Sequence, residues 1–230
     1  MPPNPPWPEA AYRLDLPHPL PVDLSALADA VFRRIWRTTL DQPGFALVRF
    51  GGPVDSPALR RFLLDLVTVF PLAFVPERLG RFDQQVSSRF HRDGAPPASL
   101  LLLGYEASRV RSRVFAADAE RAAVAAGLPV NEYLAAHNPM TPAGEAKLWP
   151  VTTELALPAN EPFVVILNNS LIPCGPDRVL GVLHKAEVPE PDADATRVIN
   201  SVGLMRAGDP AGIPKPAAAV AHFLARTDLD

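Results

Sequence analysis

The sequence predicts a mainly β protein of the α+β class, in which helices support the sheet. Three observations lead to this prediction. The chain has 230 residues, a length at which a barrel-like β domain is usually one domain. Two amphipathic helical patterns come first, and short strand-like segments bounded by turn residues fill most of the rest. No internal repeat and no shift in composition divides the chain, so we expect a single domain over residues 23–230.

The first elements are an irregular segment and two helices. Residues 1–22 are rich in proline, and we expect them to be extended and ordered only where they dock. Residues 23–36 repeat apolar side chains at helical spacing, with Asp23 or Ser25 available as a cap. Residues 55–70 repeat the pattern, with a proline near the first position. Both helices need a core to pack against.

We expect about eight strands, which share short runs of leucine, β-branched and aromatic residues. Their ranges are 45–50, 81–90, 99–106, 111–116, 147–157, 162–169, 179–188 and 196–207. Residues 118–144, which are alanine-rich and then loop-like, are expected to be a helical insertion. Residues 217–226 can form a terminal helix.

The composition is that of an ordinary globular protein, with 48% hydrophobic and 20% charged residues and a formal net charge of −3. Without a basic excess we expect no nucleic acid partner. Cys174 is the only cysteine, which rules out an intramolecular disulfide and the Cys₂ and Cys₄ zinc patterns. The first residues do not form a secretory signal, and no apolar run is long enough to span a bilayer. We therefore expect a cytoplasmic protein with no membrane partner.

The triplet His91-Arg92-Asp93 places an imidazole and a carboxylate two residues apart, at the end of a predicted strand. On an extended strand these two side chains point to the same face. Two histidines and one carboxylate can hold a transition metal and leave neighbouring positions open. The triplet alone is weak evidence. With 5 histidines and 15 aspartates in 230 residues, chance gives about 0.3 histidine-any-aspartate triplets. Residues elsewhere in the chain must support it.

A second histidine and an arginine supply that support. His184 lies in a predicted strand that is otherwise mostly apolar, and Arg197 begins the strand that follows. His91, Asp93 and His184 are thus the candidate metal ligands and the candidate catalytic residues. Arg197 is always charged, and its fork of donors can make two hydrogen bonds to a carboxylate.

In these four residues and their order, the chain resembles the Fe(II)/2-oxoglutarate-dependent dioxygenases. The N-terminal helix and the strand after Gly44 resemble the opening of the clavaminate synthase and taurine dioxygenase branch. The resemblance implies a double-stranded β-helix, which is a jelly-roll or cupin-like fold. It implies that His91, Asp93 and His184 bind Fe(II). It also implies that Arg197 binds the far carboxylate of the cosubstrate 2-oxoglutarate.

The implied reaction is the oxidation of an unidentified small molecule by O2, with 2-oxoglutarate converted to succinate and CO2. Hydroxylation, or a related oxidation such as desaturation, is favoured over halogenation, because halogenating members have a small residue in place of Asp93. The chain departs from one branch at Ile199, where that branch has a serine. Ser88, Ser201 or Thr153 could supply a hydroxyl for the cosubstrate instead.

The same residues allow other interpretations. His91 and Asp93 can form a hydrogen-bonded pair without a metal, and His184 can be a core histidine. A cupin-like metalloenzyme can use the three ligands without 2-oxoglutarate, and a β-barrel binding protein can keep the fold without catalysis. If the chain is a dioxygenase, residues 118–144 and the hairpin after Asn169 are the candidates for a lid that shields the site from water.

Overall fold

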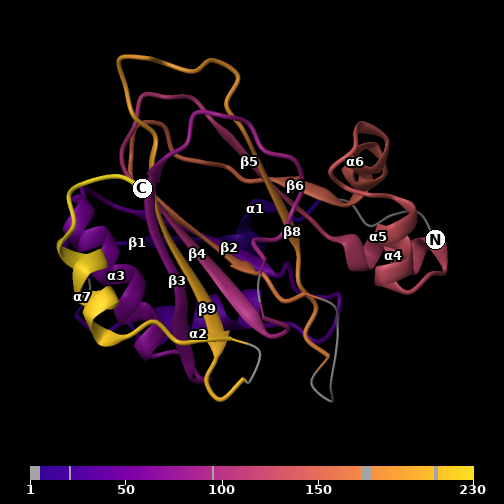
Figure 1. The fold of residues 1–230 in the computed structure, drawn as a ribbon, viewed down its shortest axis with the longest axis horizontal. Coiled ribbons are helices and arrows are strands. Elements are labelled where there is room, and N and C mark those ends of the chain that lie inside the picture. Colours follow the sequence, from indigo (N-terminus) through magenta and orange to yellow (C-terminus); the bar gives the residue numbers. More distant parts are fainter. Residues whose placement is uncertain (1–5, 21, 95, 172–177, 210–211) are drawn as a thin grey trace.

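The computed structural model describes residues 6–20, 22–94, 96–171, 178–209 and 212–230, and Figure 1 shows their arrangement. The layers run from one group of helices, through a large sheet and a small sheet, to a second group of helices. Within these residues, no helix is long and apolar enough to cross a membrane. Part of the predicted hairpin after Asn169 lies outside the described residues, and so does Cys174.

The large sheet contains six described strands in the order β1-β2-β7-β4-β9-β3. Their bounds, in that order, are Arg13–Leu16, Phe45–Phe50, Phe163–Asn168, Ser99–Tyr105, Val198–Arg206 and Phe74–Asp83. Neighbouring strands are antiparallel except β1 and β2, which are parallel. β9, the last described strand in the chain, therefore lies between β4 and β3.

The small sheet has the order β6-β5-β8. The bounds of its strands, in that order, are Thr152–Glu154, Arg113–Ala117 and Leu183–Glu187. An antiparallel backbone bridge joins His91 to His184 at the β8 edge. The described strands form two separate sheets and no closed barrel, so the protein is a mixed α+β protein with a large sheet.

Three helices cover one face of the large sheet, as the sequence predicts. They are α2 (Ser25–Ile35), α3 (Ser56–Thr68) and α7 (Ala217–Ala225). Leu100 and Leu102 of β4 pack against them in one apolar cluster. The cap of α3 is Asp55, whose carboxylate accepts a hydrogen bond of 2.8 Å from the Ala58 N–H.

The opposite face of the large sheet meets the small sheet. Leu101 and Leu103 alternate with the leucines that face the helices, and they pack with Val114, Ala116 and Ala186 of the small sheet. The alternation explains why all seven residues of β4 are buried. The space between the sheets is therefore a second core, and side chains that point into it are shielded from water.

The predicted insertion is helical, and it packs behind the small sheet. It contains α4 (Ala119–Ala126), α5 (Val130–Ala136), α6 (Pro142–Leu148) and the 3-10 turn η1 (Trp149–Val151). These elements cluster with Phe115, Ala117 and Leu183, which alternate with the residues that face the large sheet. Figure 1 shows α4, α5 and α6 grouped on the side of the molecule away from α3 and α7.

Two strand predictions are wrong in extent. The strand expected over 147–157 is reduced to β6, because Thr141 and Pro142 start α6 and the turn η1 holds Pro150. Only the first part of the strand expected over 81–90 is a strand, because β3 ends at Asp83. The chain then crosses to β8, where the Ser88 N–H donates to Ala186 O.

The described part of the proline-rich N-terminal segment docks on the sheet. A one-turn helix, α1 (Glu9–Tyr12), leads into β1, which pairs in parallel with β2. Tyr12 is 2% exposed and packs in the core between the sheets. The segment thus adds an edge strand to the large sheet, which the sequence pattern did not predict.

A buried ion pair joins the end of α2 to the start of the insertion. The Arg37 side chain is fully buried, and its guanidinium donates to Asp118 in a two-point contact of 2.6 and 2.9 Å. It also donates to Leu180 O, in the segment that leads to β8. Gly44, at φ +80°, leaves room for this group, since a Cβ there would lie 2.8 Å from Arg37 Nε.

Candidate metal centre

The two candidate histidines are neighbours across the bridge at the edge of β8. The His91 N–H donates to His184 O at 3.0 Å, and the His184 N–H donates to His91 O at 2.9 Å. His184 alternates with Leu183, which faces the insertion, so its side chain points toward the large sheet. The backbone pairing therefore fixes both imidazoles on the inner side of the small sheet.

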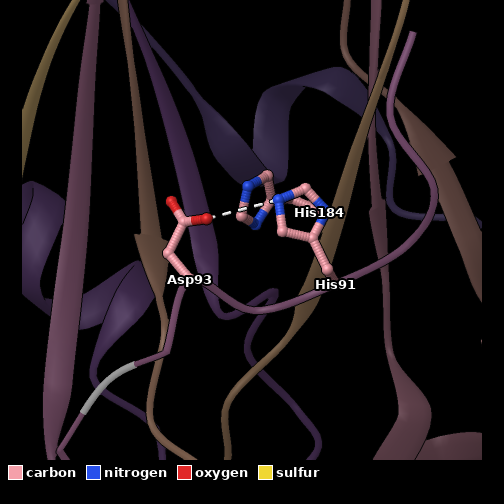
Figure 2. Close-up of side chains that lie close together, drawn as sticks. All are labelled: His91, Asp93 and His184. Atoms are coloured by element: carbon pink, nitrogen blue, oxygen red, sulfur yellow. Dashed lines mark ion pairs between the residues drawn. The ribbon is translucent and has the colours of Figure 1, made fainter. Parts of the chain in front are cut away.

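Asp93 completes a cluster of three side chains. Figure 2 shows His91, Asp93 and His184 pointing toward one another. One potential ligand atom from each lies within 4.8 Å of the other two. The His91 Nε2 to Asp93 Oδ1 distance is 3.3 Å, and the two imidazole centroids are 4.3 Å apart. The structure thus brings together the three residues that the sequence singled out, within reach of a single ion.

The charge states of the cluster suit a cation. His91 Nδ1 lies 2.6 Å from Arg89 O and therefore carries a proton, and in the protonated ring Nε2 also donates, to Asp93 Oδ1 at 3.3 Å. This hydrogen bond to Asp93 raises the pKa of His91, although burial opposes it. Burial, with the charge of His91, lowers the pKa of His184 to about 4. Burial alone would raise the pKa of Asp93, but the hydrogen bond from His91 and nearby cations lower it. At neutral pH the cluster therefore offers a neutral imidazole at His184 and a carboxylate.

One atom of the cluster lacks a partner. His184 Nδ1 is buried, and no group of the described chain forms a hydrogen bond with it. A buried polar atom left in this way costs about 1–3 kcal/mol. A metal ion bound to His184 Nδ1 would offset the cost, because it would give this nitrogen a partner. The neutral imidazole is also the form that ligates metals. The donor set and its burial thus fit a divalent transition metal.

Arg197 lies in the space between the sheets, just before β9. It is 2% exposed, and its Cζ lies 4.8 Å from the centroid of the Tyr105 ring. Nη1 donates to Gln84 Oε1 at 3.0 Å. Nε and Nη2 are buried and have no hydrogen-bond partner in the described chain. A buried guanidinium with two unsatisfied nitrogens fits an anion that binds beside it.

The pKa of Tyr105 responds to charges on both Arg197 and Asp93. Burial raises the pKa of Tyr105, the Arg197 guanidinium lowers it, and the Asp93 carboxylate raises it. Both charged groups therefore act on one phenol. A cavity of about 620 Å³ also reaches Arg197, Tyr105 and Phe163, but its lining does not include the three cluster residues.

The three candidate hydroxyls differ in their surroundings. Ser88 Oγ accepts from the Ala186 N–H at 2.9 Å, and Thr153 Oγ1 accepts from the Trp7 N–H at 2.9 Å. Both side chains thus have structural partners. Ser201 pairs with Leu103 in the sheet and shares the inner face of β9 with Ile199. Ser201 and Thr153 both lie on faces turned toward the space between the sheets, since Thr153 pairs with Ala116, but only Thr153 already has a hydrogen-bond donor in the described chain.

The insertion does not cover the open side of the cluster, so the expectation that it acts as a lid is corrected. It packs on the outer face of the small sheet, behind His184. Glu145 of α6 holds it there, through ion pairs with Lys185 and with Arg89 at 2.7 Å. Burial alone would raise the pKa of Glu145, but these two cations lower it. The insertion supports the strands that carry the imidazoles.

Two residues near the cluster were missed as functional residues in the sequence. Arg78 and Asn169 both contact the main chain of Asp93. Asn169 is one of two adjacent amides at the end of a strand, a signal that indicated a turn or a substrate contact. Arg78 lies in the first half of β3, which the strand pattern did not include.

Comparison with known proteins finds likeness among solved structures and none in sequence. No protein-family model matches the chain, and no curated protein matches its sequence. Among solved structures, the chain is similar to an asparagine oxygenase in complex with Fe(II), 2S,3S-3-hydroxyasparagine and succinate. The identity is 16%, the match covers 82% of this chain and 81% of that chain, and the TM-score is 0.46. Identity at this level does not transfer an activity from one protein to another.

Proposed function

We propose that this protein is an Fe(II)- and 2-oxoglutarate-dependent oxygenase that hydroxylates a small molecule, built on a double-stranded β-helix. The observation that carries the proposal is the presence of two buried polar groups that each lack hydrogen-bond partners in the described chain. The first belongs to the His91, Asp93 and His184 cluster, which has an unpartnered imidazole nitrogen. The second is Arg197, with two unpartnered guanidinium nitrogens. A metal and a diacid would satisfy both.

The three cluster residues would hold the metal. When bound there, Fe(II) supplies the oxidising chemistry that inserts an oxygen atom from O2 into a C–H bond, while 2-oxoglutarate becomes succinate and CO2. His91 contributes Nε2, because its Nδ1 proton is held by Arg89 O. Asp93 contributes a carboxylate that stays ionised at neutral pH, since its pKa is lowered. One carboxylate and two neutral imidazoles leave a net positive charge on a divalent ion, which favours an anionic second ligand.

Arg197 would bind the far carboxylate of 2-oxoglutarate. Its fork of donors matches a carboxylate, and its burial makes each charge-assisted hydrogen bond stronger than at the surface. Small residues lie on the inner faces of both sheets, with Ala186 two residues after His184 in β8 and with Ser201 and Gly203 in β9. Ser201 would donate a further hydrogen bond to that carboxylate. The apolar cluster between the sheets shields His184 and Arg197, whereas His91 and Asp93 are partly exposed.

Two measurements on the purified protein test this function. Calorimetry under anaerobic conditions is expected to show 2-oxoglutarate binding that requires Fe(II), because the ion and Arg197 bind its two ends. In air, the protein with Fe(II) and 2-oxoglutarate is expected to release succinate, and a chelator should stop the release. Absence of both metal-dependent binding and succinate release would show that the proposal is wrong.

Replacement of Arg197 by alanine separates this proposal from a metalloenzyme that does not use 2-oxoglutarate. Loss of two charge-assisted hydrogen bonds, each worth about 1.5–3 kcal/mol, is expected to raise the KM for 2-oxoglutarate by about 100-fold or more. Arg197→Lys keeps the charge without the fork, so we expect an intermediate KM. Fe(II) affinity should stay near that of the wild type in both variants.

The matched control is Arg109→Ala. Arg109 lines the same cavity as Arg197, but its side chain is exposed and paired with Asp192 at 2.8 Å. Its replacement should leave the KM for 2-oxoglutarate within about twofold, because surface ion pairs contribute little. Equal effects of Arg197→Ala and Arg109→Ala would remove the proposed role of Arg197 and favour the metalloenzyme alternative.

A further inference from the structure

Asp93 differs from the other two cluster residues in its backbone. His91 and His184 are held by two reciprocal main-chain hydrogen bonds of 3.0 and 2.9 Å. Asp93 comes after this bridge and belongs to no strand or helix. Its carboxylate must nevertheless face both imidazoles to act as the third ligand. Something other than the sheet therefore fixes its main chain.

The Asn169 side chain supplies two of the contacts that do this. Asn169 Nδ2 donates to Asp93 O at 3.0 Å, and the Asp93 N–H donates to Asn169 Oδ1 at 3.3 Å. A primary amide thus pairs with both polar atoms of one residue's main chain, as a neighbouring strand would. Asn169 is 2% exposed, and its own N–H donates to Ser99 O at 3.0 Å. The amide is itself anchored at the end of the large sheet.

Arg78 supplies a third contact from β3, an edge strand of the large sheet. Its Nη2 donates to Asp93 O at 2.6 Å, and its charge lowers the pKa of Asp93. Arg78 pairs with Gly203 of β9, so no side chain stands beside its stem. A Cβ at Gly203 would lie 3.3 Å from Arg78 Cβ and 3.4 Å from its Nε. The glycine therefore leaves the space that the arginine uses to reach Asp93.

We propose that Asn169 and Arg78 are positioning residues that hold the main chain of Asp93, so that its carboxylate is fixed as a metal ligand. The inference rests on the proposed function in taking Asp93 as a ligand. Both residues touch the main chain and leave the carboxylate oxygens free. Residues that orient a metal ligand in this way typically change metal affinity by 10- to 100-fold when they are replaced.

The adjacent residue, Asn168, offers a matched control. Asn168 is a fully buried amide at the end of the same strand. Its Nδ2 donates to Ile35 O at 2.9 Å, and its Oδ1 accepts from the Ser170 N–H at 3.1 Å. No described contact joins its side chain to Asp93. Replacing Asn168 therefore tests the loss of a buried amide without the loss of contact to the ligand.

The first experiment titrates the metal-free protein with Co(II), which substitutes for Fe(II) and is stable in air. We expect Asn169→Ala to raise the Co(II) Kd by about 10- to 100-fold. Asn168→Ala should lower thermal stability and leave the Kd within about threefold. Arg78 is exposed, so Arg78→Met is expected to fold even if an asparagine variant does not. It should raise the Kd by about 10-fold, with partial recovery in Arg78→Lys. Wild-type Kd values in Asn169→Ala and Arg78→Met would overturn the proposal.

A second experiment needs no metal. Hydrogen exchange of the Asp93 amide is expected to be at least about 10-fold faster in Asn169→Ala than in the wild type, because its acceptor is removed. In Asn168→Ala that amide should keep its protection. Unchanged exchange in Asn169→Ala would overturn the positioning role while the proposed function stands. Failure of the wild type to bind Co(II) would overturn both.

Discussion

Replacement of His184 by alanine is expected to abolish Fe(II)- and 2-oxoglutarate-dependent succinate release. Loss of a residue that merely orients a ligand already costs metal affinity 10- to 100-fold, so loss of the ligand itself should cost more than about 100-fold. His184 is 7% exposed, so water cannot readily take the place of the imidazole. Calorimetric Fe(II) titration and a succinate assay under matched conditions measure the two effects.

The fold should survive this replacement. The pairing of His184 with His91 uses main-chain atoms, which alanine keeps. The lost imidazole also includes a buried nitrogen without a partner, whose removal offsets part of the lost packing. His222→Ala, at an exposed position of α7, is the control and should keep full activity and metal affinity. Undiminished iron-dependent turnover in His184→Ala would show that the cluster is not the metal centre.

Replacement of Asp118 by alanine is expected to lower the free energy of unfolding by about 3–5 kcal/mol, because it leaves the Arg37 charge buried without its carboxylate. Three carbonyl groups still accept from Arg37, but none of them carries a charge. A domain of ordinary stability has only about 5–15 kcal/mol in total. The variant is therefore expected to lie close to unfolding at 37 °C, as urea denaturation followed by circular dichroism can show.

Asp118 also caps α4, where it accepts from the Arg121 N–H at 3.2 Å. Asp55→Ala is the control for this second role, because Asp55 caps α3 at an exposed position and, within the described residues, forms no ion pair with a buried cation. It should cost about 1 kcal/mol. A double variant, Arg37→Met with Asp118→Leu, removes both charges and should recover stability. If Asp118→Ala costs no more than Asp55→Ala, the buried pair is not the stabilising feature.

Much of the fold follows from local patterns in the sequence. β4 and β7 are continuous apolar runs, and α2 and α3 have a clear apolar face, so periodicity alone predicts them. β3 could not be predicted at its true start, because Pro76 and Gly80 weaken a strand pattern and the irregular register near Pro76 is decided by pairing with β9. The segment 147–157 has strand-forming residues, but a capped helix start ahead of it prevails.

Some residues of the candidate site could likewise be predicted from the sequence, and others could not. His91, Asp93 and His184 could be predicted as a cluster from their residue types, the spacing of the triplet and the strand pattern around His184, although Asp93 itself lies in no strand. Arg78 and Asn169 could not, because they bind main-chain atoms, which every residue has, and such contacts leave no pattern of residue types. The position of the insertion also depends on which face of the small sheet its apolar residues cover. Local periodicity does not identify that face.

The central position of β9 has a consequence for how the protein is made. β9 is separated by more than about 90 residues from β4 and β3, the two strands it joins. While the nascent chain is shorter than about 200 residues, β3 has no partner in the described sheet and β4 is paired on one side only. At that stage β3 and β4 have unpaired edges until β9 is synthesised. Chains with unpaired strand edges are prone to aggregation. Arg197 emerges immediately before β9, so the proposed cosubstrate site and the sheet are completed in the same step of synthesis.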